Sequence, residues 1–468
     1  MADSSYSPRL RTGLLLCGTG TAGAYQAGVL RALSEAGIKI DVVAAHGAGV
    51  MTALCAAIDG TARLWDPAGP WTDARLRQAY GWRPALRVAG VGLAAAALLL
   101  LSPLLILLIA TIAYAIGVMA SLVNLPTLSE TLIDAYRRLV ELLFNPPVLP
   151  TIIPRAVVLA VLVVIGVLVV AAVRASRQAG GRRRWRGAFW WVLVGSPLSA
   201  AEPGATLVDA LWKLVRGASN EPRPRADEIG RRYVDLLTDN LGQPGFREVL
   251  VAVHDLDARR DLVGALLGAH ARELFEARRP TGGPREAEVV DFTGPQRGLL
   301  VDFLQGALRL PVATAPEPVE FPADSYWRGE RHTVCDRPEL ISRLIDEVAG
   351  IGVEQIIVVS PAPPPALPHG MRTRPADLRG RMGELVRSIE TSTLQDACAS
   401  AAARFSGVFV IRPHHNPIGP FDFGGVYDDA SDRRRTIAEL IDQGHEDAYE
   451  CFIEPIVASG ERVEAVKH

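Results

Sequence analysis

Two long apolar segments dominate the hydrophobic pattern of the first half of the chain. The stretch from Val88 to Leu125 contains no charged side chain, and it exceeds the ~20 apolar residues that span a bilayer. A second uncharged run, from Ala156 to Val173, is close to the lower length limit for a span. Core helices of soluble proteins rarely continue this far without a polar face. The pattern therefore predicts membrane-crossing segments.

The charges around these segments bear on the number of crossings. Four arginines lie between Arg75 and Arg87, and six lie between Arg174 and Arg186. The positive-inside rule places both basic flanks in the cytoplasm. Pro103 leaves open whether the first stretch is one long tilted helix or a tight hairpin. The segment Pro126–Pro147 has mixed charge and is expected to be the connecting loop. Because both flanks are basic, they favour the same side of the membrane and hence a two-helix transmembrane hairpin over residues 85–175.

Outside these segments, short apolar runs alternate with helical patterns. A short run reads as a buried strand, and an apolar repeat every three or four residues reads as a helix. Such an alternation indicates an α/β fold with a mainly parallel sheet that is covered on both faces. The predicted strands are Leu14–Cys17, Ile40–Ala45, Val249–Asp255, Ala287–Phe292, Gln355–Ser360 and Gly407–Arg412. The predicted helices are Ala24–Gly37, Gly49–Ile58, Asp257–Arg278, Pro338–Ala349 and Leu378–Arg404.

The soluble parts before and after the membrane segment must form one domain. Residues 1–80 offer only two strands, which is too few for an independent sheet. They are therefore expected to join the strands of residues 226–468. Both parts must then lie on one side of the membrane, which again requires an even number of crossings. Residues 176–225 are expected to be a basic juxtamembrane linker, in which Ala188–Gly195 is too short to span and suits the membrane interface.

Composition narrows the classes of function. The mean hydropathy is +0.19 and the net charge is −2, so no global basic field indicates nucleic acid. Five widely spaced cysteines without a C-x-x-C pair argue against a disulfide framework or a zinc site. His414 and His415 are adjacent, and no ligand spacing near them indicates a metal. We expect neither a cofactor nor a metal.

The first predicted strand ends in a glycine-rich turn. Gly18-Thr19-Gly20-Thr21-Ala22-Gly23 has the form G-x-G-x-x-G between a strand and a helix. One interpretation is a dinucleotide site, with the pyrophosphate at the helix N-terminus. That site needs an acid at the end of the second strand, whereas Asp41 lies at its beginning. A nucleotide-binding membrane protein remains an alternative.

A longer stretch resembles the start of a patatin-like phospholipase domain. The turn is followed by Gly23-Ala24-Tyr25, then by Gly28-Val29-Leu30, an amphipathic helix, and Ile40-Asp41 before a strand. The resemblance covers about fifty residues and implies a three-layer α/β fold. It also implies an ester hydrolase in which the glycine loop, here Gly18, Gly20, Thr21 and Gly23, stabilises an oxyanion. A serine on a sharp strand-to-helix turn attacks the ester, assisted by an aspartate.

The catalytic positions depart from that pattern. The nucleophile elbow aligns as Ala45-His46-Gly47-Ala48-Gly49, so Gly47 stands where the serine is expected. Glycine has no side chain that can attack, and it tolerates the strained backbone of such an elbow. The aspartate belongs in a D-G-G or D-G-A turn. The best positional match, Trp327–Pro338, has no such motif, and Asp422-Phe423-Gly424-Gly425 is a late, imperfect match.

These patterns give three functional expectations. The first is a membrane-anchored, catalytically degenerate patatin-like protein that binds lipid or acts in regulating lipid metabolism. The second is an active phospholipase or lipid acyl hydrolase with a non-standard nucleophile, for which Cys17, Thr19 and Thr21 lie near the glycine turn. The third is the nucleotide-binding protein. We expect the inner (plasma) membrane, multi-pass insertion, a cytoplasmic soluble domain and phospholipid as partner. A protein partner or a homo-oligomer is left open.

Overall fold

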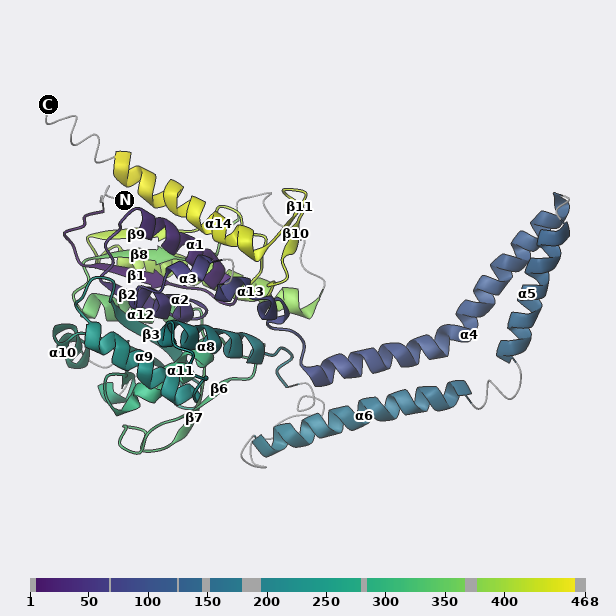
Figure 1. The fold of residues 1–468 in the computed structure, drawn as a ribbon, viewed down its shortest axis with the longest axis horizontal. Helices are drawn as coiled ribbons and strands as arrows, with labels where there is room; N and C mark the ends of the chain where they lie inside the picture. The colour runs from purple at the N-terminus through teal and green to yellow at the C-terminus, as the bar shows by residue number, and fades with distance from the viewer. Residues whose placement is uncertain are drawn as a thin grey trace. The chain divides into compact units, whose positions relative to one another are not determined.

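The chain divides into two compact units. The structure is a computed structural model, and it describes residues 6–66, 69–123, 126–144, 152–178, 195–278, 284–366 and 377–458. One unit comprises Met1–Gly81 with Leu198–His468, and the other comprises Trp82–Pro197. The apolar segments fall in the second unit, so the first contains the α/β fold (Figure 1).

Regular elements of the first unit follow the alternation that the sequence shows. The strands are β1 Thr12–Leu16, β2 Val42–Ala45, β3 Glu248–Asp255, β4 Arg260–Leu266, β5 Val289–Asp291, β6 Glu317–Glu320, β7 Arg331–Cys335, β8 Gln355–Val359, β9 Gly407–Ile411, β10 Val426–Asp428 and β11 Arg433–Arg435. The helices are α1 Ala22–Glu35, α2 Gly49–Ala57, α3 Ala62–Trp65, α8 Ala201–Arg216, α9 Ala226–Asn240, α10 Ala269–Ala277, α11 Leu300–Ala307, α12 Leu340–Gly350, α13 Leu378–Ala401 and α14 Ile437–Ala448. Short 3-10 helices are η1 Pro70–Thr72, η2 Ala74–Gln78, η4 Arg285–Ala287 and η5 Pro295–Leu299, and η6 Tyr449–Ile453 is a π-helix.

The central sheet draws strands from both sides of the insertion. Its order is β5-β4-β3-β2-β1-β8-β9, with β7 paired to β3 and β6 paired to β7. The neighbours of β1 and β2 are all parallel, with Leu15 of β1 opposite Ala44 of β2 and Val358 of β8. Antiparallel pairing occurs where β3 meets β4 and β7. The expectation of a mainly parallel sheet shared by the two parts of the chain is confirmed.

Helices cover both faces of this sheet. One core packs side chains such as Leu14 and Leu16 of β1 against α1, α2, α8, α9, α11 and α14. The other packs the alternate side chains, such as Leu15, against α10, α12 and α13. Because successive side chains of a strand point to opposite faces, the nearly continuous apolar strands serve both cores. The unit therefore has three layers (Figure 1).

Two segments of this unit differ from the sequence-based expectation. Asp257–Arg278 was predicted as one helix, but it contains β4 and then α10. Asp255 accepts the backbone N–H groups of Asp257 and Ala258, which closes the turn between β3 and β4. Residues Ala201–Arg216, within the expected linker, form α8 and bury Leu207 and other apolar side chains in the core.

Helix α14 packs very closely on α1 through glycines. A Cβ atom built on Gly28 would lie 1.8 Å from the backbone oxygen of Ile441, and one built on Gly444 would lie 2.1 Å from the oxygen of Tyr25. The Tyr25 hydroxyl also donates to Asp447 of α14 at 2.9 Å. Two glycines thus permit a helix contact that any side chain would prevent, and this contact fixes α1, which follows the glycine turn (Figure 1).

Among its described residues, the second unit has three helices, α4 Pro84–Leu122, α5 Pro126–Phe144 and α6 Ile152–Gln178. Helix α4 is continuous and contains two stretches apolar enough to cross a membrane, Pro84–Ser102 and Leu104–Leu122; a third is Pro154–Arg174 in α6. These assignments rest on length and composition. At 1.5 Å per residue, α4 measures about 58 Å, about twice the thickness of a hydrocarbon core. The first apolar stretch is thus one long helix.

The connection expected to be a loop is largely helical. Helix α5 covers most of Pro126–Pro147, because Leu132, Ile133 and Tyr136 recur at helical spacing and form an apolar face. Tyr136 contacts Tyr114 of α4, with ring centroids 5.4 Å apart. Charged side chains such as Glu130, Asp134 and Arg137 lie at other positions of α5, so an amphipathic helix packs on α4. Most of the arginine-rich segment that follows α6, together with Ala188–Val194, lies outside the described residues.

Candidate functional site

The glycine turn and the elbow lie beside each other. Strands β1 and β2 are adjacent and parallel, so the turns that follow them meet at one edge of the sheet. The backbone N–H of Ala48 in the elbow donates to the oxygen of Gly18 in the turn at 2.9 Å. The structure thus brings together Gly18, Gly20, Thr21, His46 and Gly47. Ligands of open α/β sheets bind at this carboxyl end of the strands.

Gly47 has no room for a side chain. Its φ is +61°, in the left-handed region that favours glycine. A Cβ atom built there would lie 2.4 Å from the backbone oxygen of Gly18 and 2.9 Å from Oδ2 of Asp336. The elbow therefore keeps the expected left-handed backbone conformation. Atoms of Gly18 and Asp336 fill the space that a nucleophile side chain would need.

Asp336 is the aspartate that faces the elbow. It follows β7, within the segment Trp327–Pro338 that matched the expected position without the expected motif. Its Oδ2 accepts the Thr19 hydroxyl at 3.2 Å, and its Oδ1 lies 3.0 Å from Nδ1 of His46. All three side chains are buried. The search for a D-G-G motif missed Asp336, although a strand followed by Asp-Arg-Pro and a helix was a usable signal.

Burial and Asp336 act on the pKa of His46 in opposite directions. Burial alone lowers the pKa of His46, but the charge and hydrogen bond of Asp336 outweigh burial and raise the pKa well above its ordinary value. The Cys17 thiol also interacts with the ring. Nε2 of His46 has no hydrogen-bond partner among the described residues. His46 and Asp336 thus form a buried pair that links the elbow to the end of β7.

Internal acceptors fill the N–H donors of Thr19 and Thr21 in the glycine turn. The N–H of Thr19 donates to Oε1 of Glu390 at 2.9 Å. The N–H of Thr21 donates to the oxygen of Pro420 at 3.0 Å, and its hydroxyl donates to the oxygen of Gly419 at 2.9 Å. A Cβ atom on Gly20 would lie 1.8 Å from that same oxygen of Pro420. Protein atoms therefore stand against the turn where an ester oxygen would bind.

The segment that covers the turn, residues 416–421, is here called the strap. Arg387 of α13 donates Nη1 to the oxygen of Asn416 at 2.9 Å and Nη2 to the oxygen of Ile418. Arg379 donates to the oxygen of Phe421. Phe421 is 1% exposed and lies against Tyr80, with ring centroids 5.1 Å apart. The strap is thus an integral part of the core.

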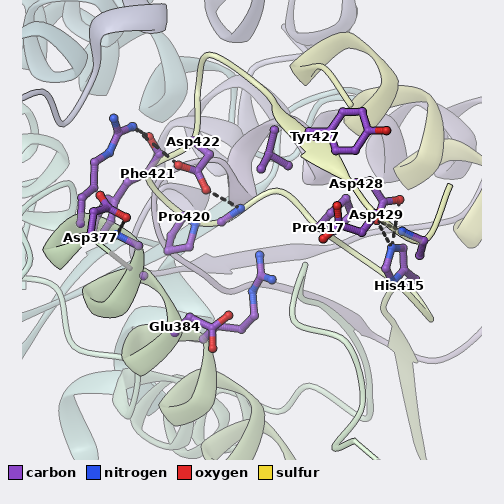
Figure 2. A pocket seen from close by; sticks show the side chains of 17 residues that line it. Asp377, Glu384, His415, Pro417, Pro420, Phe421, Asp422, Tyr427, Asp428 and Asp429 are labelled. Atoms are coloured by element: carbon purple, nitrogen blue, oxygen red, sulfur yellow. Dashed lines mark hydrogen bonds and ion pairs between the residues drawn. The ribbon is translucent and has the colours of Figure 1, made fainter. Parts of the chain in front are cut away.

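Asp422 lies on the outer side of the strap. Its Oδ2 accepts the N–H of Gly419 at 3.1 Å, and Arg379 approaches its Oδ1 at 3.9 Å (Figure 2). It lines a groove of about 570 Å³ whose wall also includes Glu384, His415 and Tyr427 (Figure 2). Neither the glycine turn nor the elbow lines this groove. The contacts of Asp422 shape the strap, and Asp336 instead faces the elbow.

The two remaining candidate glycines have packing roles. A Cβ atom on Gly23 would overlap the ring of Trp71, with its nearest ring atom at 2.0 Å, and one on Gly49 would lie 2.4 Å from the oxygen of Leu16. Each permits a close approach at the start of α1 or α2. Among the residues that the structure describes, no group of three His, Cys, Asp or Glu side chains is placed to hold a metal ion.

Comparisons with known proteins leave the family open. No protein-family model matches the chain, and no curated protein sequence matches it. Among solved structures, the chain is similar to the crystal structure of VipD from Legionella pneumophila, at 11% identity and a TM-score of 0.32. That match covers 97% of this chain and 69% of the VipD chain. A TM-score this low does not establish a common fold.

Proposed function

We propose that this chain is a membrane-anchored, catalytically silent patatin-like protein that binds lipid or regulates lipid metabolism at the membrane. The observation that carries the proposal is the occupied glycine turn. The N–H groups of Thr19 and Thr21 already donate to Glu390 and Pro420. An oxyanion is stabilised only by donors that are free to reach it, and losing one such donor typically costs ~10²–10³ in kcat.

The elbow supports the same conclusion independently. Gly47 offers no attacking atom, and the space that a serine would need is taken by Gly18 and Asp336. A nucleotide is disfavoured by the same geometry, because a pyrophosphate needs the turn N–H groups that Glu390 and Pro420 occupy. A silent domain accounts for both the lost nucleophile and the filled donors.

Membrane anchoring is the second part of the proposal. The apolar stretches of α4 and α6 are long enough to cross a bilayer. The arginines on both flanks favour a cytoplasmic position for the α/β unit. This orientation, in the inner (plasma) membrane, brings the domain to anionic phospholipid headgroups, which basic juxtamembrane segments attract.

Catalytic silence is tested with a fluorophosphonate probe on the full chain in detergent micelles. We expect no labelling above that of a heat-treated sample, while an active serine hydrolase in the same micelles is labelled. Fatty-acid release from mixed phospholipid vesicles should likewise remain at the background rate. Heat-sensitive labelling, or release that scales with protein concentration, would overturn catalytic silence.

One observation favours a second candidate, an active hydrolase whose nucleophile is Thr19. Its hydroxyl donates to Asp336 at 3.2 Å, which is the nucleophile–carboxylate contact that such a hydrolase needs. Thr19 is 2% exposed, so this activity requires the strap to move. Substitution Thr19→Val separates the candidates, because labelling that disappears in this folded variant assigns the reaction to Thr19.

A further inference from the structure

The glycine turn resembles an occupied anion site. Thr19 lies two residues before Thr21, the N-cap of α1, and the N-terminus of a 14-residue helix attracts negative charge. The group that accepts the Thr19 N–H is a carboxylate, Oε1 of Glu390 at 2.9 Å. A ligand-like group is therefore already bound to the turn, and it comes from α13, on the other face of the sheet from α1.

Stability alone gives no reason for an acid at this position. Glu390 is 8% exposed and has no ion pair with any residue that the structure describes. Burying a carboxylate without a cationic partner costs several kcal/mol. Its neighbour one turn later on α13, Leu394, is equally buried but apolar. An apolar residue at position 390 would avoid the cost, so the carboxylate is explained by the donor that it meets.

Glu390 also borders a cavity large enough for one water. The cavity measures about 10 Å³ and is lined by Thr19, Thr21, Glu390, Asn416 and the strap. A volume of ~10–15 Å³ is the least that holds a water molecule. Among the described residues, the carboxylate of Glu390 accepts one hydrogen bond, at Oε1, and its side chain lines this space. The carboxylate of Glu390 can therefore accept more hydrogen bonds than the described residues supply.

We propose that the glycine turn is a carboxylate-binding site and that Glu390 occupies it as an internal ligand. This inference deepens the proposed function and rests on it, since the internal ligand is what keeps the turn closed. A carboxylate is the ligand class because the bound group is one. When the side chain of Glu390 is removed, a small external carboxylate takes its place.

The charged groups around Glu390 fit this role. His46 on the elbow and Asp336 after β7 act on Glu390 electrostatically without an ion pair, and Arg387 of α13 lines the same cavity. Burial raises the pKa of Glu390 to about 7; the Thr19 N–H and His46 oppose that rise, and Asp336 adds to it. Near neutral pH part of Glu390 is therefore protonated. The neutral acid accepts the Thr19 N–H less strongly than the carboxylate does.

Chemical rescue tests the proposal on the full chain in micelles. Glu390→Ala should lower the apparent Tm, and sodium acetate or formate should restore part of the loss, compared with sodium chloride at equal ionic strength. At ten times its Kd, acetate raises the ratio of folded to unfolded protein about 11-fold. Leu394→Ala is the matched control, since it empties space on the same helix without exposing an N–H donor. Equal gains from acetate in both variants, or no gain in either, would overturn the proposal.

A second variant covers the case in which Glu390→Ala does not fold. Glu390→Gln keeps the shape but cannot titrate. Its apparent Tm should respond less to pH between 5 and 8 than that of the wild-type protein, and acetate should add nothing because the site is filled. An unchanged pH response would show that Glu390 does not titrate at the turn and would refute the assignment. Fluorophosphonate labelling of the wild-type protein, a separate result, bears only on catalytic silence.

Discussion

Installing the missing nucleophile is the most direct perturbation of this site. In Gly47→Ser, the new Cβ meets the backbone oxygen of Gly18 at 2.4 Å and Oδ2 of Asp336 at 2.9 Å. The carboxylate can rotate only by giving up Thr19 and His46. The carbonyl can move only by weakening its bond from Ala48. We therefore expect a destabilised protein that remains unreactive.

The magnitude follows from a matched glycine. Gly37 has a φ of +63°, almost that of Gly47, and a Cβ atom there would meet nothing within 4 Å. Gly37→Ser thus carries only the cost of a left-handed L-residue, ~1–2 kcal/mol. Gly47→Ser carries that cost and also the cost of overpacking, ~1–3 kcal/mol. The difference between the two variants isolates the steric clash at the elbow.

Two readouts are needed from these variants. The apparent Tm of the full chain in micelles should fall roughly 1–4 °C further for Gly47→Ser than for Gly37→Ser, because 1 kcal/mol shifts the Tm of a unit of about 350 residues by about 1.4 °C. Fluorophosphonate labelling should stay at background in both, because the turn donors remain filled by Glu390 and Pro420.

Either of two results would refute this reasoning. Equal Tm losses in the two variants would mean that the contacts around Gly47 relax without cost, so packing would not explain the glycine. Labelling of Gly47→Ser would mean that an ester-like probe reaches the elbow and that Asp336 supports a nucleophile there. The second result would make the protein a hydrolase lacking one side chain.

Three further outcomes are expected. Gly28→Ala should destabilise the fold by about 3 kcal/mol or more, because its Cβ would lie 1.8 Å from the oxygen of Ile441; Gly204→Ala, where the nearest atom lies at 3.9 Å, should gain up to ~1 kcal/mol, and thermal unfolding compares them. Stability should fall as pH rises from 5 to 8.5: the pKa of Glu390 is raised from 4.5 to about 7, so about 3 kcal/mol present at low pH is lost through that window. The pKa of His46 is also raised, so its contribution is present below 6.5 and is lost at higher pH; a flat profile of apparent Tm would contradict both. Protease added outside sealed inverted inner-membrane vesicles should cleave sites on both sides of α4–α6, whereas protection of one side would show an odd number of crossings.

The sequence predicted the strands that are apolar on both faces. Strand β8, Gln355–Val359, is buried throughout, so its run of apolar letters is visible without the fold. Strands β4 and β7 were not predicted from the sequence because each begins with charged or polar residues. In β7, Arg331 and His332 precede the apolar pair, and His332 is buried because it pairs with Asp255 of β3. That pairing joins residues 77 positions apart, which a local pattern does not reveal.

The elbow was predictable to the level of its backbone. A strand, a glycine with positive φ and a helix follow from Ala45-His46-Gly47-Ala48-Gly49, and the structure has all three. The partner of the elbow was not predictable from a motif, since Asp336 reaches it from 290 residues away and sits in no D-G-G turn. Geometry identifies this aspartate where sequence spacing offered Asp422.

The filling of the turn is the feature that sequence could least reveal, and it changes what the glycines mean. Gly18-Thr19-Gly20 in a sequence indicates free N–H donors, yet here the acceptors come from positions 390 and 420. Gly20 is needed because the oxygen of Pro420 lies against it, and Gly47 is needed because Gly18 and Asp336 lie against it. Packing therefore suffices to require both glycines, so their presence is no evidence that the turn performs catalysis.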